Sequence, residues 1–177
     1  GLLFMGGAVS EDHIRAFKTA TVPIVLCATT DEREMYPSVD IDHKAAARDA
    51  VRELLKQGHR RIGMISGPLE DPTAGYARFQ GYKEALEEAG LKVEEELVRI
   101  GNYRYESGQE IARYFLELDP RPTAIFAAND EMAIGAIHSI QDAGLKVPED
   151  LSVIGLDNTR MASMVRPQLT TVAQPMY

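Results

Sequence analysis

The sequence predicts an α/β protein in which short buried strands alternate with amphipathic helices and pair into parallel sheets. The apolar runs are mostly continuous rather than alternating, as expected for strands covered on both faces. Between them, apolar side chains recur at spacings of three and four residues, which define one face of a helix. Gly58, Gly90 and Gly144 each follow such a segment, and glycine accepts the left-handed conformation that ends a helix. This order of strand, helix, glycine and strand is typical of sheets with helical crossovers.

The predicted strands are the apolar runs at 2–5, 24–28, 62–66, 97–100, 124–128, 151–156 and 169–172. The predicted helices lie at 11–20, 43–57, 75–89, 106–118 and 130–142. The last helix differs from the others because its apolar residues surround most of its circumference, which indicates burial on more than one side. It is therefore either a central core helix or a helix that faces a partner subunit.

These elements divide into two unequal subdomains. Residues 1–41 supply two or three strands and one helix, too little for a covered sheet of their own. Residues 42–172 supply five βα-like units, enough for an almost complete subdomain. Residues 173–177 would begin a connection back to the first subdomain. Because the first residues already lie inside a predicted strand, we expect a segment of a longer protein in which the first subdomain is truncated.

Composition argues against a nucleic-acid-binding domain. The formal net charge is -8, whereas such domains carry the clustered positive charge that neutralises phosphates. The single cysteine, Cys27, excludes an internal disulfide and fits a reducing cytoplasm. No run approaches the roughly 20 apolar residues of a membrane helix, and no signal sequence opens the chain. We therefore expect a cytoplasmic segment that does not hold duplex DNA by itself.

The sequence also lacks the motifs of an enzyme. It contains no Gly-x-Ser-x-Gly elbow, no phosphate-binding Gly-Lys-Ser/Thr loop, no dinucleotide fingerprint and no Cys/His spacing of a metal site. The four histidines, His13, His43, His59 and His138, are scattered over helices and helix ends, where surface or capping positions are expected. We therefore predict no catalytic residue, no metal and no cofactor.

Polar side chains follow three of the predicted strands directly. Ser66 ends the run at 62–66, Asn129 and Asp130 follow 124–128, and Asp157 follows 151–156. Ligands of open parallel sheets bind outside the carboxyl ends of the strands, and these side chains can exchange hydrogen bonds with the hydroxyl groups of a sugar or a similar polar ligand. The alternative is that Asn129, Asp130 and Asp157 only cap helices.

Arg78 lies near the start of the helix at 75–89, where a positive charge opposes the helix dipole. This position predicts another role, such as binding an anionic group of a ligand. The alternative is a surface ion pair with a nearby carboxylate, either Glu70 or Asp71.

Taken together, several motifs resemble the effector-binding domain of the LacI/GalR family of bacterial transcription regulators. They are Gly58–Ile62, Gly67-Pro68, Arg78–Tyr82, Pro122–Phe126, Asn129–Gly135, Val147–Gly155, Asp157-Asn158, Leu169–Val172 and Gln174-Pro175. The resemblance implies a type I periplasmic-binding-protein-like fold, with two doubly wound parallel-sheet subdomains and a cleft between them. It also implies a homodimer and a missing helix-turn-helix headpiece, through which alone the protein would contact operator DNA. In the cleft, Arg78, Asn129, Asp157, Asp130 and Ser66 would face the effector.

The last twenty or so residues are similar to the branch of this family that serves carbon catabolite control in Gram-positive bacteria. This similarity implies serine-phosphorylated HPr as a protein corepressor, with glycolytic sugar phosphates as accessory effectors. It places Tyr177 at the start of the helix that would face this partner. The predicted mechanism is allosteric and not enzymatic: a ligand that bridges the two subdomains stabilises one cleft geometry and so sets operator binding. The alternative is a sugar-binding protein of a transporter, which has the same fold.

Overall fold

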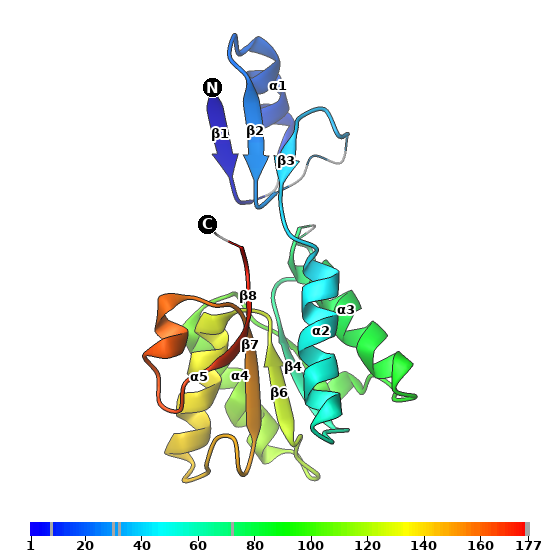
Figure 1. The fold of residues 1–177 in the computed structure, drawn as a ribbon, viewed down its shortest axis with the longest axis vertical. Helices are drawn as coiled ribbons and strands as arrows, with labels where there is room; N and C mark the ends of the chain where they lie inside the picture. Colours follow the sequence, from blue (N-terminus) through cyan, green and yellow to red (C-terminus); the bar gives the residue numbers. More distant parts are fainter. Residues whose placement is uncertain (8, 30, 32, 72, 176–177) are drawn as a thin grey trace.

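The computed structural model describes residues 1–7, 9–29, 31, 33–71 and 73–175, so Tyr177 lies outside the described residues. Two separate sheets form, and every strand pair in both is parallel. Figure 1 shows them as two bodies joined near residue 40, with the chain after the last strand leaving the larger body toward the smaller one. We refer to the bodies as the N-terminal and the C-terminal subdomain.

The N-terminal subdomain holds a sheet in the order β1-β2-β3, formed by Leu2–Met5, Ile24–Cys27 and Ser38–Val39. Helix α1, Glu11–Thr19, packs on one face of this sheet through Phe17. Ser10 starts the helix because its hydroxyl accepts from the backbone N–H of His13 while the His13 ring accepts from the backbone N–H of Ser10.

The C-terminal subdomain holds five strands in the order β5-β4-β6-β7-β8. Their bounds are Ile62–Ser66 for β4, Val98–Ile100 for β5, Ala124–Ala127 for β6, Ser152–Asp157 for β7 and Thr170–Ala173 for β8. The chain moves from β4 outward to β5 and then returns past β4 to β6. The sheet order therefore reverses between β4 and β6, and such a switch point leaves a crevice at the carboxyl ends of the two strands.

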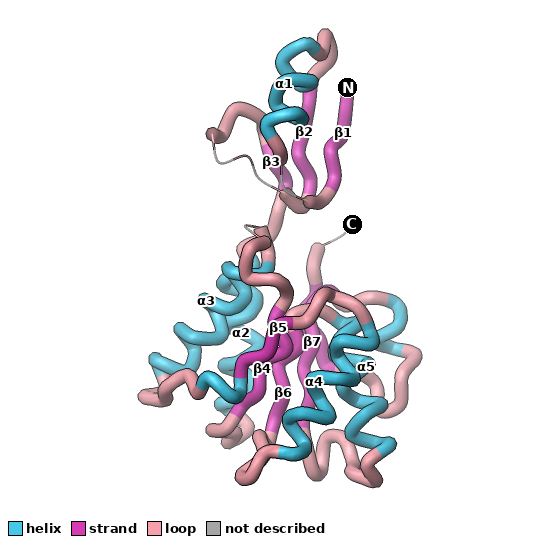
Figure 2. Tube along the Cα trace, turned by 180° about the vertical axis from the view of Figure 1, so that it is seen from behind, coloured by secondary structure: helices cyan, strands magenta, loops and turns pink. Residues whose placement is uncertain are grey.

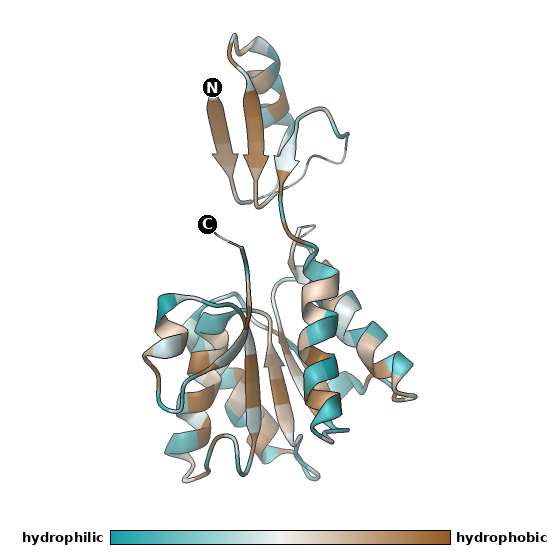
Figure 3. Cartoon of the chain, in the orientation of Figure 1, coloured by the Kyte–Doolittle hydropathy of each residue, from teal (hydrophilic) through white to brown (hydrophobic). Residues whose placement is uncertain are grey.

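Helices cover both faces of this larger sheet. Helices α2, His43–Lys56, and α3, Gly75–Glu88, pack together on one face. Helices α4, Tyr105–Glu117, and α5, Asp130–Asp142, pack together on the other, so Figures 1 and 2 show a three-layer arrangement. Two 3-10 turns, Glu95–Leu97 and Arg160–Ser163, lie before β5 and after β7. Figure 3 shows apolar residues along the strands and polar ones on the outer sides of the helices.

Helix α5 packs against the sheet, the neighbouring helix α4 and the 3-10 turn after β7, which accounts for its apolar circumference within a single chain. Met132, Ile137 and Ile140 are at most 1% exposed. The close approach of α4 and α5 requires glycine, because a Cβ built at Gly108 would lie 2.2 Å from the Met132 main-chain oxygen. The core interpretation of this helix is therefore confirmed, and no partner subunit is needed to explain its composition.

The predicted helices are all present, and their bounds agree to within one or two residues. The seven predicted strands are present with similarly small shifts. The short strand β3 was not located in advance, because Ser38–Val39 is no apolar run and both residues are exposed. Among the described residues, no helix combines the length and the apolar character that a membrane crossing demands.

Candidate functional site

An open cavity of about 660 Å³ lies at the carboxyl ends of the C-terminal strands and is bordered by both subdomains. The N-terminal subdomain contributes Gly7, which follows β1, and Ala28, which follows β2. The remaining lining residues come from the C-terminal subdomain and the segment after β8: His43, Pro68, Glu70, Asp71, Thr73, Ala74, Arg78, Tyr103, Asn129, Asp157 and Gln174. The cavity therefore lies at the edge of the sheet where the sequence predicts a ligand site.

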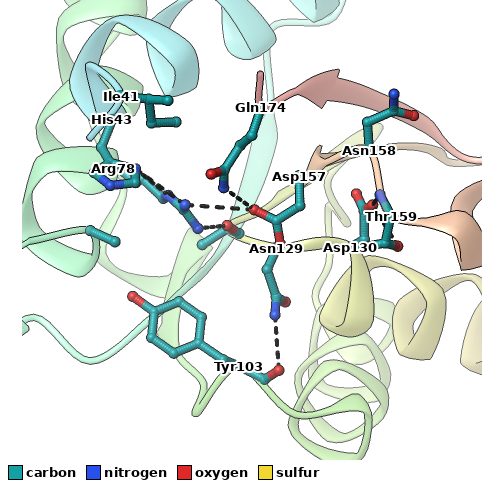
Figure 4. Close-up of polar contacts among 12 residues, drawn as sticks. Ile41, His43, Arg78, Tyr103, Asn129, Asp130, Asp157, Asn158, Thr159 and Gln174 are labelled. Carbon is teal, nitrogen blue, oxygen red and sulfur yellow. Dashed lines mark hydrogen bonds and ion pairs between the residues drawn. The ribbon is translucent and has the colours of Figure 1, made fainter. Parts of the chain in front are cut away.

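Arg78 reaches the cavity from the first turn of α3 and is only 4% exposed. A buried guanidinium must replace its lost hydration with partners. It donates to the main-chain oxygen of Ala128, and its Nε and Nη2 lie 3.3 and 3.2 Å from Nδ1 of His43. Its Nη2 lies 3.7 Å from Oδ1 of Asp157 (Figure 4). Burial lowers the pKa of Arg78, but an arginine remains protonated in proteins, so the cavity keeps a fixed positive charge.

Asp157 ends β7 and faces Arg78 across the cavity floor. Its φ angle is 129°, a conformation rare for a residue with a side chain, and such outliers cluster at functional sites. Gln174 donates to its Oδ1 from the segment after β8. Desolvation raises the pKa of Asp157 to about 6, against the opposing attraction of Arg78. The carboxylate is therefore an acceptor whose charge the fold only partly stabilises.

Asn129 both caps a helix and lines the cavity. Its Oδ1 accepts from the backbone N–H of Met132 at 3.0 Å, and its Nδ2 donates to the main-chain oxygen of Tyr103 at 2.9 Å. The capping alternative raised by the sequence is thus correct for Asn129, and the same side chain remains at the cavity wall. The carboxylate of Asp157 contacts Arg78 and Gln174, and a backbone hydrogen bond from Asp130, the first residue of α5, lowers its pKa.

Asp130 is fully buried and turned away from the cavity. Its Oδ2 accepts from the backbone N–H of Thr159 at 2.6 Å and from the Thr159 hydroxyl at 2.9 Å, and its Oδ1 accepts from the Thr171 hydroxyl. The carboxylate therefore fastens the loop after β7 and the strand β8 to the start of α5. Its expected place beside an effector is not what the structure shows.

Ser66 is likewise fully buried and is not a lining residue. It belongs to β4 and shares a sheet face with Met64, which packs against α2 and α3. The expectation that it faces the effector assumed that the last residue of the strand is exposed at the rim. The chain instead continues through Pro68 before it reaches the cavity.

The carboxylate of Asp71 binds backbone N–H groups at the start of α3 and does not pair with Arg78. Its carboxylate accepts from the backbone N–H groups of Thr73, Ala74 and Gly75 and from the Tyr103 hydroxyl at 2.8 Å. These hydrogen bonds lower the pKa of Asp71 although burial opposes them. The alternative of an ion pair between Arg78 and Glu70 or Asp71 is therefore wrong, because the carboxylate that pairs with Arg78 is that of Asp157.

Among the lining residues that sequence reasoning did not single out as site residues, three have polar side chains that contact other lining residues: His43, Tyr103 and Gln174. His43 was expected at a surface or capping position, but it is 7% exposed and contacts Arg78. Tyr103 lies with its ring against Gly67, where a Cβ would be 2.1 Å from the ring. Gln174 reaches Asp157 from a segment distant in sequence. Only the three-residue spacing of Asp40 and His43 gave a local signal, since these two side chains form a pair.

The described part of the lining has more acidic than basic groups. Arg78 is balanced by Asp157, while Glu70 and Asp71 add negative charge. Among the residues that the structure describes, no group of three or more His, Cys, Asp and Glu side chains is arranged to hold a metal. The chemistry that this arrangement offers is hydrogen bonding to a polar ligand, with carboxylate and amide groups beside one buried cation.

The fold and this cavity define a class of ligand-binding domain. A family model for the periplasmic binding protein-like domain matches residues 51–177, and the chain belongs to this family. Catabolite control protein A of Priestia megaterium is 50% identical over 177 residues, which are 100% of this chain and 53% of that protein. The HTH-type transcriptional repressor CytR of Escherichia coli K12 is 40% identical over 177 residues, 100% of this chain and 52% of that protein. The chain thus spans about half the length of these relatives.

The fold is shared with solved regulator structures. The transcriptional regulator CelR in complex with cellobiose matches with a TM-score of 0.86 at 36% identity, over 99% of this chain and 54% of that one. Other solved neighbours are regulators of the LacI family. The predicted periplasmic-binding-protein-like fold and the resemblance to LacI/GalR regulators are confirmed.

Proposed function

We propose that this chain senses an effector for a LacI/GalR-type transcription regulator of carbon catabolite control, and that it does so without catalysis. The observation that carries the proposal is the cavity, because its lining joins Gly7 and Ala28 of one subdomain to Arg78 and Asp157 of the other. A ligand held there contacts both subdomains. It can therefore favour one relative geometry by its differential affinity for the two states.

The ligand class that fits the described lining best is a neutral polyhydroxylated molecule, such as a free sugar. Arg78 already donates to Ala128 and His43 and faces Asp157. A phosphate dianion at this place would also meet the negative charges of Glu70 and Asp71, and like charges at close range repel. Hydroxyl groups can instead donate to Asp157 and accept from Asn129. Sugar phosphates, implied by the resemblance, are the second candidate, and Arg78 is the residue that favours them.

The partners of the whole protein belong to the proposal as well. We propose a cytoplasmic homodimer that binds operator DNA through a helix-turn-helix headpiece outside this chain. Residues 40–42 and 173–175 would connect the two subdomains. Serine-phosphorylated HPr is the proposed corepressor, in keeping with the similarity to catabolite control protein A.

The test is calorimetric titration of the full-length protein with a panel of cellobiose, glucose, glucose 6-phosphate and inorganic phosphate. We expect a neutral sugar to bind most tightly and Asp157→Ala to remove most of that affinity. The matched control is Asp142→Ala, which deletes an exposed carboxylate at the far end of α5. If no panel compound binds to folded protein, or if Asp157→Ala binds like Asp142→Ala, the proposed site is wrong.

A second titration tests the corepressor. Serine-phosphorylated HPr should bind the full-length protein and unphosphorylated HPr should not. Equal binding of the two forms, or no binding of either, would remove HPr from the proposal and leave small molecules as the primary effectors.

A further inference from the structure

One chain of contacts runs from the segment that connects the subdomains to the arginine of the cavity. His43, the first residue of α2, directly follows the connecting residues 40–42 and is 7% exposed. Its Nε2 lies 3.1 Å from Oδ1 of Asp40. Its Nδ1 lies 3.2 and 3.3 Å from Nη2 and Nε of Arg78 (Figure 4). A buried ring thus stands between the connecting segment and Arg78.

The partners of the ring determine its protonation. A guanidinium has five N–H donors and no acceptor, so Nδ1 of His43 can face Arg78 only as an unprotonated acceptor. The other ring nitrogen, Nε2, then carries the single proton and donates it to Asp40. A second proton on Nδ1 would place an N–H and a positive charge directly against Arg78. The contact therefore requires the neutral imidazole.

A second contact reaches the same pair of residues from the other end of the subdomain. Gln174 lies beyond β8, where the chain leaves the sheet toward the N-terminal subdomain (Figure 1). It donates to Oδ1 of Asp157, which faces Arg78. His43, next to the connecting residues 40–42, therefore contacts Arg78, and Gln174, in the segment after β8, contacts Asp157. A movement of either segment displaces a partner of the pair.

We propose that His43 is a positioning residue of the effector site: its neutral ring ties the connecting segment to Arg78, and a proton on it weakens ligand binding. Only the expected effect on ligand affinity rests on the proposed function. The tautomer and the contacts of His43 can be examined in the absence of any ligand.

The charges around His43 support a neutral ring at neutral pH. They come from Arg78 on α3, Asp40 on the connecting segment and Asp71 in the loop before α3. Desolvation and then Arg78 lower the pKa of His43, while the two carboxylates act in the opposite direction with smaller effect. The ring therefore gains its second proton at a lower pH than an ordinary histidine does, and the contact with Arg78 is lost when it gains that proton.

The first experiment is long-range ¹H–¹⁵N NMR of the full-length protein labelled at histidine. We expect His43 to be a neutral ring protonated at Nε2 at pH 7.5, with a titration midpoint below that of a free histidine. The variant His43→Asn identifies its signals. A ring protonated at Nδ1, or a midpoint above the free value, overturns the proposal whatever the effector is.

The second experiment measures the affinity of the most tightly bound panel compound between pH 5 and pH 7.5. An asparagine at position 43 places its Oδ1 near Nδ1 of the histidine and can still accept from Arg78, whereas a glutamine reaches the Nε2 position and serves Asp40 instead. At pH 7.5 we expect His43→Gln to bind roughly tenfold more weakly than the wild type, the size of one lost charge-assisted hydrogen bond. His43→Asn should lose less.

The pH profile separates a positioning role from a merely structural one. In the wild type both His43 and Asp157 must lose a proton for full affinity, whereas in His43→Asn only Asp157 titrates, so its profile should be shallower. His59→Asn is the matched control, because His59 contacts Thr123 at the opposite end of the sheet. A profile in His43→Asn as steep as in the wild type overturns the proposal. Failure of every panel compound to bind overturns the proposed function alone, and the NMR result then decides on His43.

Discussion

Substitution of Asp130 distinguishes a structural carboxylate from the carboxylate of Asp157, which we propose binds the ligand. This side chain is fully buried and accepts three hydrogen bonds, two from Thr159 and one from Thr171. Asp130→Ala deletes the acceptor of all three donors. A lost hydrogen bond to a charged group costs about 1.5–3 kcal/mol, but Thr159 is exposed and can regain part of this from water. We therefore expect a local loss of about 3 kcal/mol in Asp130→Ala.

Asp130→Asn provides the matched comparison. Its amide can keep an oxygen toward Thr159, and its nitrogen can donate to the Thr171 hydroxyl, which is able to accept as well as to donate. The network then survives in shape without the charge, and we expect a loss of about 1 kcal/mol. The difference in stability between Asp130→Ala and Asp130→Asn gives the cost of the unpaired donors separately from the cost of the missing charge.

Hydrogen exchange of the full-length protein, followed by mass spectrometry, measures this effect where it arises. A loss of about 3 kcal/mol corresponds to exchange faster by roughly a hundredfold, and it should be confined to peptides that cover the loop after β7 and the strand β8. Affinity for the panel compounds should change much less than in Asp157→Ala. If Asp130→Ala exchanges like the wild type and yet loses ligand affinity, Asp130 belongs in the binding site and our assignment is wrong.

Three further predictions concern stability. Desolvation raises the pKa of Asp157 to about 6 from 3.8, so its charged form destabilises the fold. Asp157→Asn should therefore be more stable than the wild type by up to about 3 kcal/mol at pH 7.5, and urea titrations should show this difference vanish below about pH 4. A variant that is less stable than the wild type at pH 7.5 contradicts this prediction. Gly108→Ala should lower the free energy of unfolding by about 2–4 kcal/mol, because its Cβ would lie 2.2 Å from a main-chain oxygen of α5. Gly144→Ala, in open space at φ +78°, should lower it by about 1–2 kcal/mol. Equal melting temperatures of the two variants would refute the close approach of α4 and α5. Tyr82→Phe removes a buried hydroxyl that donates to the main-chain oxygen of Ile62 at 2.8 Å, and thermal unfolding should show a loss of about 1 kcal/mol.

The fold was predictable because its information is local and repeated. Most strands of the C-terminal sheet lie in apolar runs, and the crossovers that precede β5, β6 and β7 contain helices with apolar side chains at spacings of three and four, so the period distinguishes strand from helix. Glycines at 58, 90 and 144 mark the helix ends and all have positive φ angles. Strand β3 had no such signal, because both of its residues are exposed and lack a buried apolar face. Pairing with β2 holds them in place.

The site was predictable only where the rule of strand ends applies. Asp157 ends one buried strand and Asn129 follows another, and both line the cavity. The rule does not say which way a side chain turns, and Asp130, one residue after Asn129, points into the subdomain because Thr159 and Thr171 need an acceptor there. The buried role of His43 depends on tertiary contacts that no sequence period records.

Exposure decides what a ligand meets first at the Arg78–Asp157 pair. The side chain of Arg78 is 5% exposed and that of Asp157 is 26% exposed. Arg78 also donates to Ala128 and to His43, so its donors are largely engaged before any ligand arrives. Under the proposed function, a ligand would encounter the carboxylate of Asp157 as an acceptor and Arg78 as the charge that holds this carboxylate in place. We expect such a pair to favour hydroxyl donors over anions. The same proposal makes the orientation of Arg78, and with it the neutral ring of His43, a condition for binding.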